Sequence, residues 1–183
     1  GAVGALDYRE KAPLRATRNM YLDKKGDFIS EKSKLGALAV GVPGTVAGIF
    51  EVYKKFGSLP LDQLFKPVID LAKNGHIITS KQASRLNQFK KIIKDVNSEE
   101  SLYTQNYKEG DTLKNVALAN TLIRISKNGR KEFYEGETAR TMVDYLDSKN
   151  GIITLKDFKA YEAIWREPIV FNYKDLKIDR KSV

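Results

Sequence analysis

The tripeptide Lys-Asn-Gly occurs three times, at residues 73–75, 127–129 and 149–151, and it constrains the fold more than any other feature. Each copy follows a segment whose apolar residues recur at helical spacing. A lysine in the last helical turn and a glycine just beyond it form a common helix stop, because the cation faces the negative helix end and glycine accepts left-handed backbone. The unequal spacings argue against a repeat protein and predict separate helices that end in the same way.

Apolar periodicity predicts about five helices in the middle of the chain. We expect them at residues 45–55, from 59–62 to 73–75, at 80–94, 112–127 and 136–148, with a short helical turn at 155–161. Thr45 and Ser80 are the expected N-caps of the first and third helices. Residues 30–38 and 97–111 are expected to be loops.

Short strands are expected near both ends of the chain. Residues 5–9, 169–171 and 176–178 are strand candidates, with a turn at 172–174 between the last two. A further turn is expected at 23–27 between two extended pieces. The sequence therefore predicts an α+β fold that is predominantly α-helical.

The composition is that of an ordinary globular domain, with 42% hydrophobic and 30% charged residues in 183. A net charge of +9 raises the possibility of a nucleic-acid or other anionic partner. The charges are dispersed and lack interleaved aromatic residues, so we interpret them as solvated helix surface and expect no nucleic acid. A basic helical module that binds an anionic partner remains the alternative interpretation.

Several kinds of chemistry find no support in the sequence. There is no cysteine, which excludes disulfides, thiolate metal sites and a cysteine nucleophile. His76 is the only histidine and is expected to be exposed or to act in capping. Residues 147–158 resemble a calcium loop superficially, but neither register places both the glycine and the first carboxylate correctly, so no metal is expected. No apolar run approaches the ~20 residues of a membrane span, and no signal peptide is recognisable.

Arg9 is the main candidate for ligand binding. Residues 7–13 read Asp-Tyr-Arg-Glu-Lys-Ala-Pro, and residues 16–21 read Ala-Thr-Arg-Asn-Met-Tyr. Arginine supplies the planar, permanently charged fork that suits carboxylate recognition. The competing interpretation is an arginine that pairs only with the adjacent acids, Asp7 or Glu10.

This segment resembles the Asp-aromatic-Arg-Glu-x-Ala-Pro and Ala-Thr-x-x-Met-aromatic segments of γ-glutamyltranspeptidases. Further resemblances follow in the family's order along nearly the whole chain. They include Gly-Val-Pro-Gly-Thr-Val-Ala-Gly at 41–48, Leu-Ala-x-x-Gly at 71–75, Glu-Phe-Tyr-x-Gly at 132–136, and Gly-Ile-Ile-Thr-x-x-Asp-Phe-x-x-Tyr at 151–161. Most of these glycines occupy cap or close-packing positions and so indicate fold more than chemistry.

The resemblance implies a fold, an activity and a role for Arg9. Residues 1–178 would be the middle part of the large subunit of an Ntn-hydrolase enzyme with an αββα core, and residues 179–183 a truncation or foreign tail. Arg9 would bind the α-carboxylate of a γ-glutamyl donor such as glutathione. The family's N-terminal threonine nucleophile attacks the γ-glutamyl carbonyl, and water or an amino acid accepts the glutamyl group.

The resemblance also implies what this chain lacks. The threonine segment of the nucleophile is absent, so we expect no catalytic residue here and no turnover by the chain alone. No cofactor is expected, and the expected partners are the remainder of the large subunit and the small subunit. The location implied is periplasmic or secreted. A capsule-anchoring transpeptidase or an acylase of the same superfamily remains a related alternative.

Overall fold

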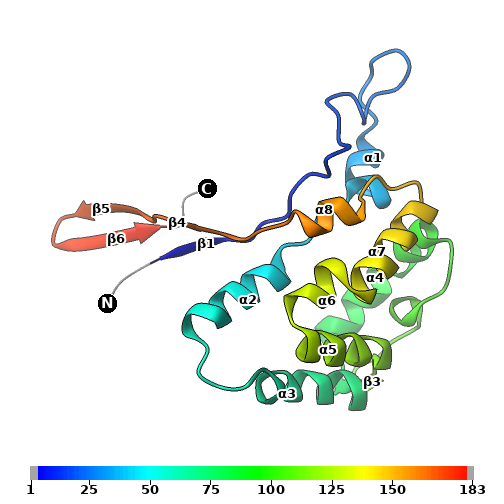
Figure 1. The fold of residues 1–183 in the computed structure, drawn as a ribbon. Coiled ribbons are helices and arrows are strands. Elements are labelled where there is room, and N and C mark those ends of the chain that lie inside the picture. Colours follow the sequence, from blue (N-terminus) through cyan, green and yellow to red (C-terminus); the bar gives the residue numbers. More distant parts are fainter. Residues whose placement is uncertain (1–3, 181–183) are drawn as a thin grey trace.

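The computed structural model describes residues 4–180 and consists of a helical body with an extended arm of strands (Figure 1). The helices are α1 (Ser30–Lys34), α2 (Thr45–Phe56), α3 (Leu61–Asn74), α4 (Ser80–Asn97), α5 (Val116–Asn128), α6 (Arg130–Glu135), α7 (Glu137–Ser148) and α8 (Leu155–Lys159), with 3-10 turns at Ala37–Ala39 and Leu102–Thr104. The mixed, predominantly helical fold expected from the sequence is confirmed.

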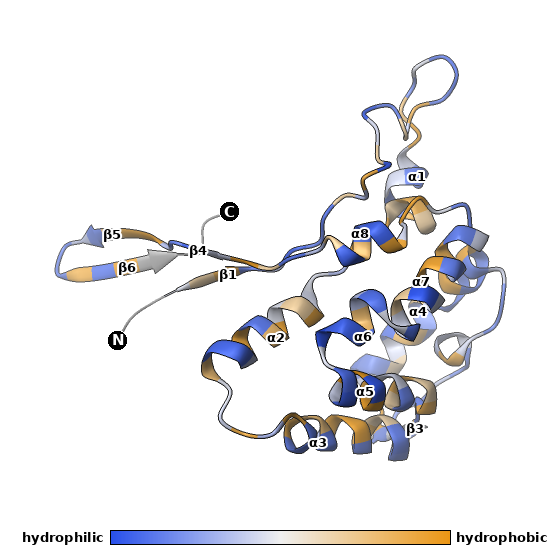
Figure 2. Ribbon diagram, viewed as in Figure 1, coloured by the Kyte–Doolittle hydropathy of each residue, from blue (hydrophilic) through white to orange (hydrophobic). Residues whose placement is uncertain are grey.

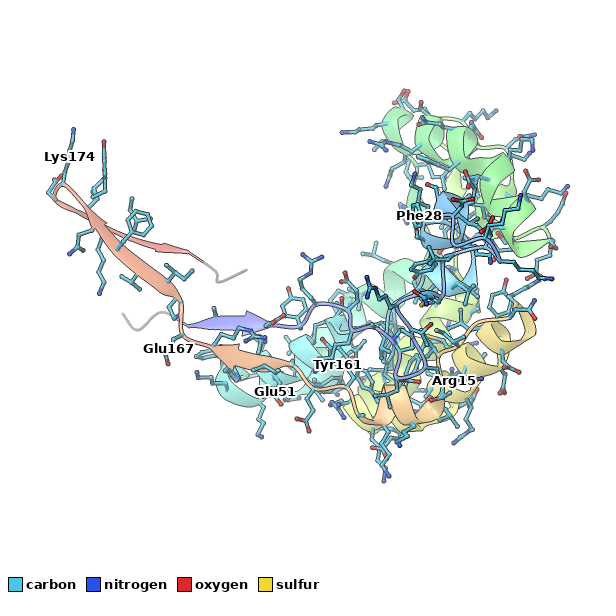
Figure 3. All side chains as sticks on the ribbon, turned by 90° about the horizontal axis from the view of Figure 1, so that it is seen from above. Arg15, Phe28, Glu51, Tyr161, Glu167 and Lys174 are labelled. Carbon is cyan, nitrogen blue, oxygen red and sulfur yellow. The ribbon has the colours of Figure 1, made fainter. Side chains whose placement is uncertain are left out.

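The strands of the described residues form three separate antiparallel pairs. Strand β1 (Ala5–Asp7) pairs with β4 (Ile164–Arg166), β2 (His76–Ile77) with β3 (Thr112–Leu113), and β5 (Ile169–Tyr173) with β6 (Leu176–Arg180). The register places Leu6 opposite Trp165, so the two ends of the chain run side by side. Figure 3 shows the tip of the β5–β6 hairpin, at Lys174, projecting far from the helices.

Two of the three Lys-Asn-Gly stops act as expected. Gly75 and Gly129 are the C-cap residues of α3 and α5, with φ of 91° and 67°. At the third copy the left-handed residue is Asn150, with φ of 60°. Gly151 instead donates its N–H to the Leu146 carbonyl at 2.8 Å, and a Cβ at this residue would lie 2.7 Å from the same oxygen.

Several local expectations were wrong. Gly44, not Thr45, is the N-cap of α2, and Thr79, not Ser80, caps α4 through a capping box with Gln82. Thr112–Leu113 forms a strand, so α5 begins later than expected. The loop expected at 30–38 contains α1, and 97–111 contains a 3-10 turn. Helix α6 and strands β2, β3 and β4 were not foreseen, because each has six residues or fewer and shows no usable periodicity.

The strand expectations at the two ends fare better. β1 lies within residues 5–9, and β5 and β6 cover the other two candidates, although their turn lies at residues 174–175 and not at 172–174. The extended pieces around 23–27 meet in a bridge between Leu22 and Phe28. The boundary expected at residue 178 falls inside β6, and residues 181–183 lie outside the described part of the chain.

The principal hydrophobic core lies where α2, α6, α7 and α8 meet the segment before α2. Its buried members are Val42, Ala47, Tyr134, Ala139, Ile153, Phe158 and Tyr161. A smaller cluster of Ile78, Ala83 and Tyr107 lies under α4. Figure 2 shows apolar and polar residues alternating around the helices, as expected for amphipathic elements that cover a core on one side.

Candidate functional site

Arg9 follows β1 directly, and the neighbouring Asp7 anchors this segment to the other end of the chain. The Arg166 guanidinium donates from Nε to Asp7 Oδ2 at 2.7 Å, and its Nη2 forms an ion pair with the same oxygen at 2.7 Å. The other oxygen of Asp7 accepts the main-chain N–H of Arg9 at 3.2 Å. Asp7 therefore holds the backbone at Arg9 and pairs with the charge of Arg166.

The main chain on the other side of Arg9 is held by Tyr161 and by a bridge to Val42. The Tyr161 hydroxyl donates to the Arg9 carbonyl at 2.6 Å across 152 residues of sequence. Lys11 and Val42 exchange two backbone hydrogen bonds, at 3.2 and 2.8 Å. Tyr161 is 2% exposed, and its ring stacks on Tyr134 with centroids 5.7 Å apart. The position of Arg9 thus depends on groups in the core.

Two glycines at the start of α2 let the Arg9 segment approach the helix closely. A Cβ at Gly44 would lie 2.0 Å from Tyr161 Oη and 2.1 Å from the carbonyl oxygen of Tyr8. A Cβ at Gly48 would lie 2.5 Å from Tyr8 Cγ. These contacts are far inside van der Waals distance, so any side chain at Gly44 would displace the segment.

Tyr134, whose side chain is completely buried, holds the start of α2 from the core side. Its hydroxyl donates to the Pro43 carbonyl at 2.8 Å and accepts the N–H of Ala47 at 3.1 Å. Burial raises the pKa of Tyr134 to about 12, since the phenolate would be desolvated there. Tyr134 therefore remains a neutral donor at any physiological pH.

The Arg9 side chain itself points into solvent beside a hollow of about 440 Å³ that is lined by residues 8–10, 41 and 43–45. It is 72% exposed, and Nη2 contacts Glu10 Oε1 at 3.2 Å. The pKa of Glu10 is lowered by its own backbone N–H and then by this guanidinium. The pairing with Glu10 considered from the sequence is therefore present.

An exposed ion pair of this kind contributes little to stability, because water solvates and screens both charges. A ligand carboxylate that meets Arg9 in a bidentate manner would compete with Glu10 at little cost. The arrangement is that of an arginine on a fixed backbone with a readily exchanged partner.

The other sequence candidates lie apart from this site. His76 is exposed in β2 and lines a different cavity. Within residues 4–180 no group of histidine, aspartate and glutamate side chains is placed to hold a metal ion. Asp157, in the calcium-like segment, completes the capping box of α8 with the N-cap Thr154 and accepts the Leu14 N–H at 2.6 Å.

Sequence reasoning missed Tyr161, Tyr134 and Arg166 as supports of Arg9. Each is remote in sequence, and Tyr161 was noticed only as the last position of a motif. The aromatic residues in that motif carried a weak signal, because tyrosine in a core needs a partner for its hydroxyl group.

A family model described as gamma-glutamyltranspeptidase matches residues 1–181. The glutathione hydrolase proenzyme of Escherichia coli (strain K12) is 35% identical over 182 residues, which are 97% of this chain and 31% of that protein. The crystal structure of Helicobacter pylori gamma-glutamyltranspeptidase matches with a TM-score of 0.93 and 40% identity, over 100% of this chain and 53% of that one. The Pseudomonas nitroreducens enzyme complexed with L-DON matches with a TM-score of 0.87 and 35% identity, over 97% and 53%.

The chain spans about a third of the length of the curated relatives it matches and about half of the solved chains. In the part of the chain that the structure describes, no helix combines the length and apolar character needed to cross a bilayer.

Proposed function

Because this chain belongs to the gamma-glutamyltranspeptidase family, we propose that it forms the donor-binding part of an enzyme that cleaves γ-glutamyl compounds such as glutathione. Arg9 binds the α-carboxylate of the donor. The observation that carries the proposal is the exposed guanidinium of Arg9 on a backbone fixed from both sides, next to a hollow of about 440 Å³.

The chemical steps take place on residues outside this chain. An N-terminal threonine attacks the γ-glutamyl carbonyl, and water or an amino acid then accepts the glutamyl group. The chain supplies binding and orientation of the donor, and its partners are the remainder of the large subunit and the small subunit. We place the complete enzyme in the periplasm or outside the cell.

Kinetics of the complete enzyme test the role of Arg9. Arg9→Ala removes a charged hydrogen-bonded pair worth about 1.5–3 kcal/mol, so the donor KM should rise roughly 10- to 150-fold. Arg9→Lys keeps the charge but loses the planar fork and should recover only part of the affinity. Lys25→Ala, at an exposed turn, serves as the control. An unchanged donor KM in Arg9→Ala would remove Arg9 from the donor site.

A second experiment tests the expectation that the chain is inactive alone. The purified 183-residue chain is incubated with a chromogenic γ-glutamyl anilide, and no release beyond background is expected. Sustained release that exceeds the amount of protein would contradict the assignment of the nucleophile to another part of the enzyme.

A further inference from the structure

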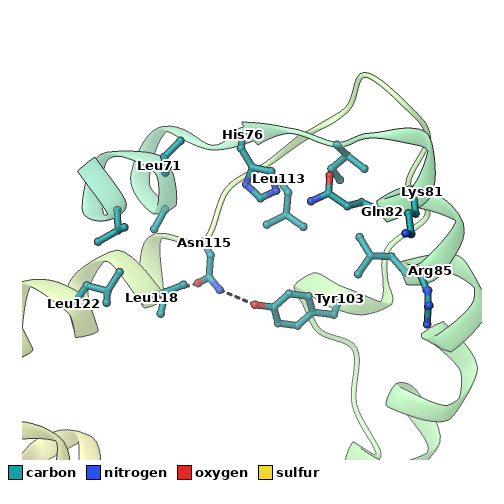
Figure 4. A pocket seen from close by; sticks show the side chains of 14 residues that line it. Leu71, His76, Lys81, Gln82, Arg85, Tyr103, Leu113, Asn115, Leu118 and Leu122 are labelled. Atoms are coloured by element: carbon teal, nitrogen blue, oxygen red, sulfur yellow. Dashed lines mark hydrogen bonds between the residues drawn. The ribbon is translucent and has the colours of Figure 1, made fainter. Parts of the chain in front are cut away.

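A second cavity, of about 650 Å³, lies between α3, α4, α5 and the β2–β3 pair (Figure 4). It has no lining residue in common with the hollow at Arg9. Its volume falls within the roughly 300–1,000 Å³ that is typical of small-molecule sites.

One end of this cavity is apolar. Leu71 of α3 faces Leu118 and Leu122 of α5 there (Figure 4). Leu71 is 54% exposed and Leu118 is 44% exposed. Covering such side chains with an apolar ligand is favourable, at about 25 cal/mol per Å² removed from water.

The other end carries two cations, Lys81 and Arg85, which come from the first turns of α4. Among residues 4–180, no hydrogen bond or ion pair joins either side chain to a partner, and no aspartate or glutamate lines the cavity. This end of the cavity is therefore suited to a negative group.

Two amide side chains are fixed so that neutral donors also face the cavity. Gln82 Oε1 accepts from the Thr79 N–H and hydroxyl, at 2.9 and 3.0 Å, which turns its Nε2 away from the cap and toward the cavity (Figure 4). Asn115 accepts the Leu118 N–H at 2.9 Å and donates to Tyr103 Oη at 3.1 Å. The Tyr103 phenol proton is then available to a ligand.

We propose that this cavity binds an amphipathic acid, a single carboxylate on an unbranched alkyl tail, with the carboxylate among Lys81, Gln82 and Arg85 and the tail between α3 and α5. The charge of the lining excludes the zwitterionic head of a γ-glutamyl donor, whose ammonium group would face cations. The site is therefore separate from the proposed donor site and does not depend on the proposed function.

Calorimetric titration of the 183-residue chain with decanoate, octanoate and decanamide tests the proposal, with all three kept below the concentrations at which they aggregate. We expect saturable binding of decanoate with one site per chain. Octanoate, which lacks two of the methylenes, should bind roughly 15-fold more weakly, since each buried methylene contributes about fourfold in affinity. Decanamide should bind at least tenfold more weakly than decanoate, and high salt should weaken only the acids.

Paired variants separate the two ends of the cavity. Lys81→Gln with Arg85→Gln should weaken decanoate at least tenfold, whereas Lys73→Gln with Lys127→Gln removes the same charge outside the cavity and should change binding less than twofold. Leu118→Gln should weaken binding, while Leu64→Gln, at a position of similar exposure on α3, should not. Circular dichroism checks that each variant is folded.

Three outcomes with the 183-residue chain would overturn the proposal. They are no saturable binding of decanoate, equal affinity for decanamide, and equal losses in the cavity and control variants. A chain with the full length of the relatives should bind decanoate as well. Loss of binding there would assign this face to a contact within the longer protein and not to a ligand.

Discussion

Replacing Tyr161 with phenylalanine tests whether the core holds the backbone of Arg9. The substitution removes only the hydroxyl that donates to the Arg9 carbonyl at 2.6 Å. The ring remains, and with it the stacking on Tyr134 and nearly all of the buried apolar area. The free energy of unfolding should therefore fall by the value of one hydrogen bond and of a carbonyl left without its donor, about 1–2 kcal/mol.

Urea denaturation followed by circular dichroism measures this loss. With a slope of about 2 kcal/mol per molar, the midpoint should decrease by roughly 0.5–1 M. Tyr173→Phe is the matched control, because Tyr173 is 57% exposed and no hydrogen bond of its hydroxyl is recorded among the described residues. Its midpoint should stay within experimental error of the unmodified chain.

The same substitution has a functional consequence in the complete enzyme. Arg9 keeps its charge but loses one restraint on its main chain, so the donor KM should rise roughly three- to tenfold, less than in Arg9→Ala, with kcat nearly unchanged. A Tyr161→Phe chain as stable as the unmodified one, together with an unaltered donor KM, would refute the idea that Tyr161 positions Arg9.

Four further results are expected. Gly44→Ala places a Cβ 2.0 Å from Tyr161 Oη, so the free energy of unfolding measured by urea denaturation should fall by about 2–3 kcal/mol. A smaller fall than in Tyr161→Phe would contradict the close packing at Gly44. Burial raises the folded-state pKa of Tyr134 to about 12, so the free energy of unfolding should be unaffected by this group below pH 10 and should fall by about 2–3 kcal/mol between pH 10 and 12. Measured by alkaline titration, this fall should be absent in Tyr134→Phe. Burial opposes ionisation of Asp157, but hydrogen bonds from Leu14 and Thr154 outweigh this effect and lower the pKa of its carboxyl group. The free energy of unfolding should therefore fall below about pH 4, and Asp157→Asn should abolish this acid dependence. The chain should self-associate through its exposed β5–β6 hairpin, and light scattering should show less association for Phe171→Lys, whereas a monodisperse unmodified monomer would contradict this.

The helices were largely predictable because their signals are local. Apolar periodicity and the glycines after α3 and α5 lie within one or two turns of what they determine. The α+β class and the family, whose fold is that of the Ntn hydrolases, were also recognised correctly. Helix α6 was not foreseen because it has only six residues and because its Glu132 is buried and charged, which is opposite to the usual pattern. It is tolerated because Thr138 and Arg124 satisfy the carboxylate.

The surroundings of Arg9 could not be derived in the same way. Tyr161 and Arg166 are 152 and 159 residues from their partners, and no periodicity links positions so far apart. The N-cap errors have a similar origin in competition between neighbours. Thr79 and Ser80 are both good caps, and the choice depends on Gln82 three residues beyond Thr79. That Arg9 binds the α-carboxylate of the γ-glutamyl donor stays a prediction.

The pairing of β1 with β4 has a consequence for the order of folding. Asp7 and Arg166 are 159 residues apart, whereas the helices of the body pack against partners nearer in sequence, such as α3 against α5 and α6 against α7. Contacts of such long range require the entropic cost of closing a long loop before they contribute any stability, so they tend to form late. The helical body should therefore assemble first, and the segment that carries Arg9 should dock onto it in one of the last steps. Only a chain that has completed its folding would then present the arginine in its final position.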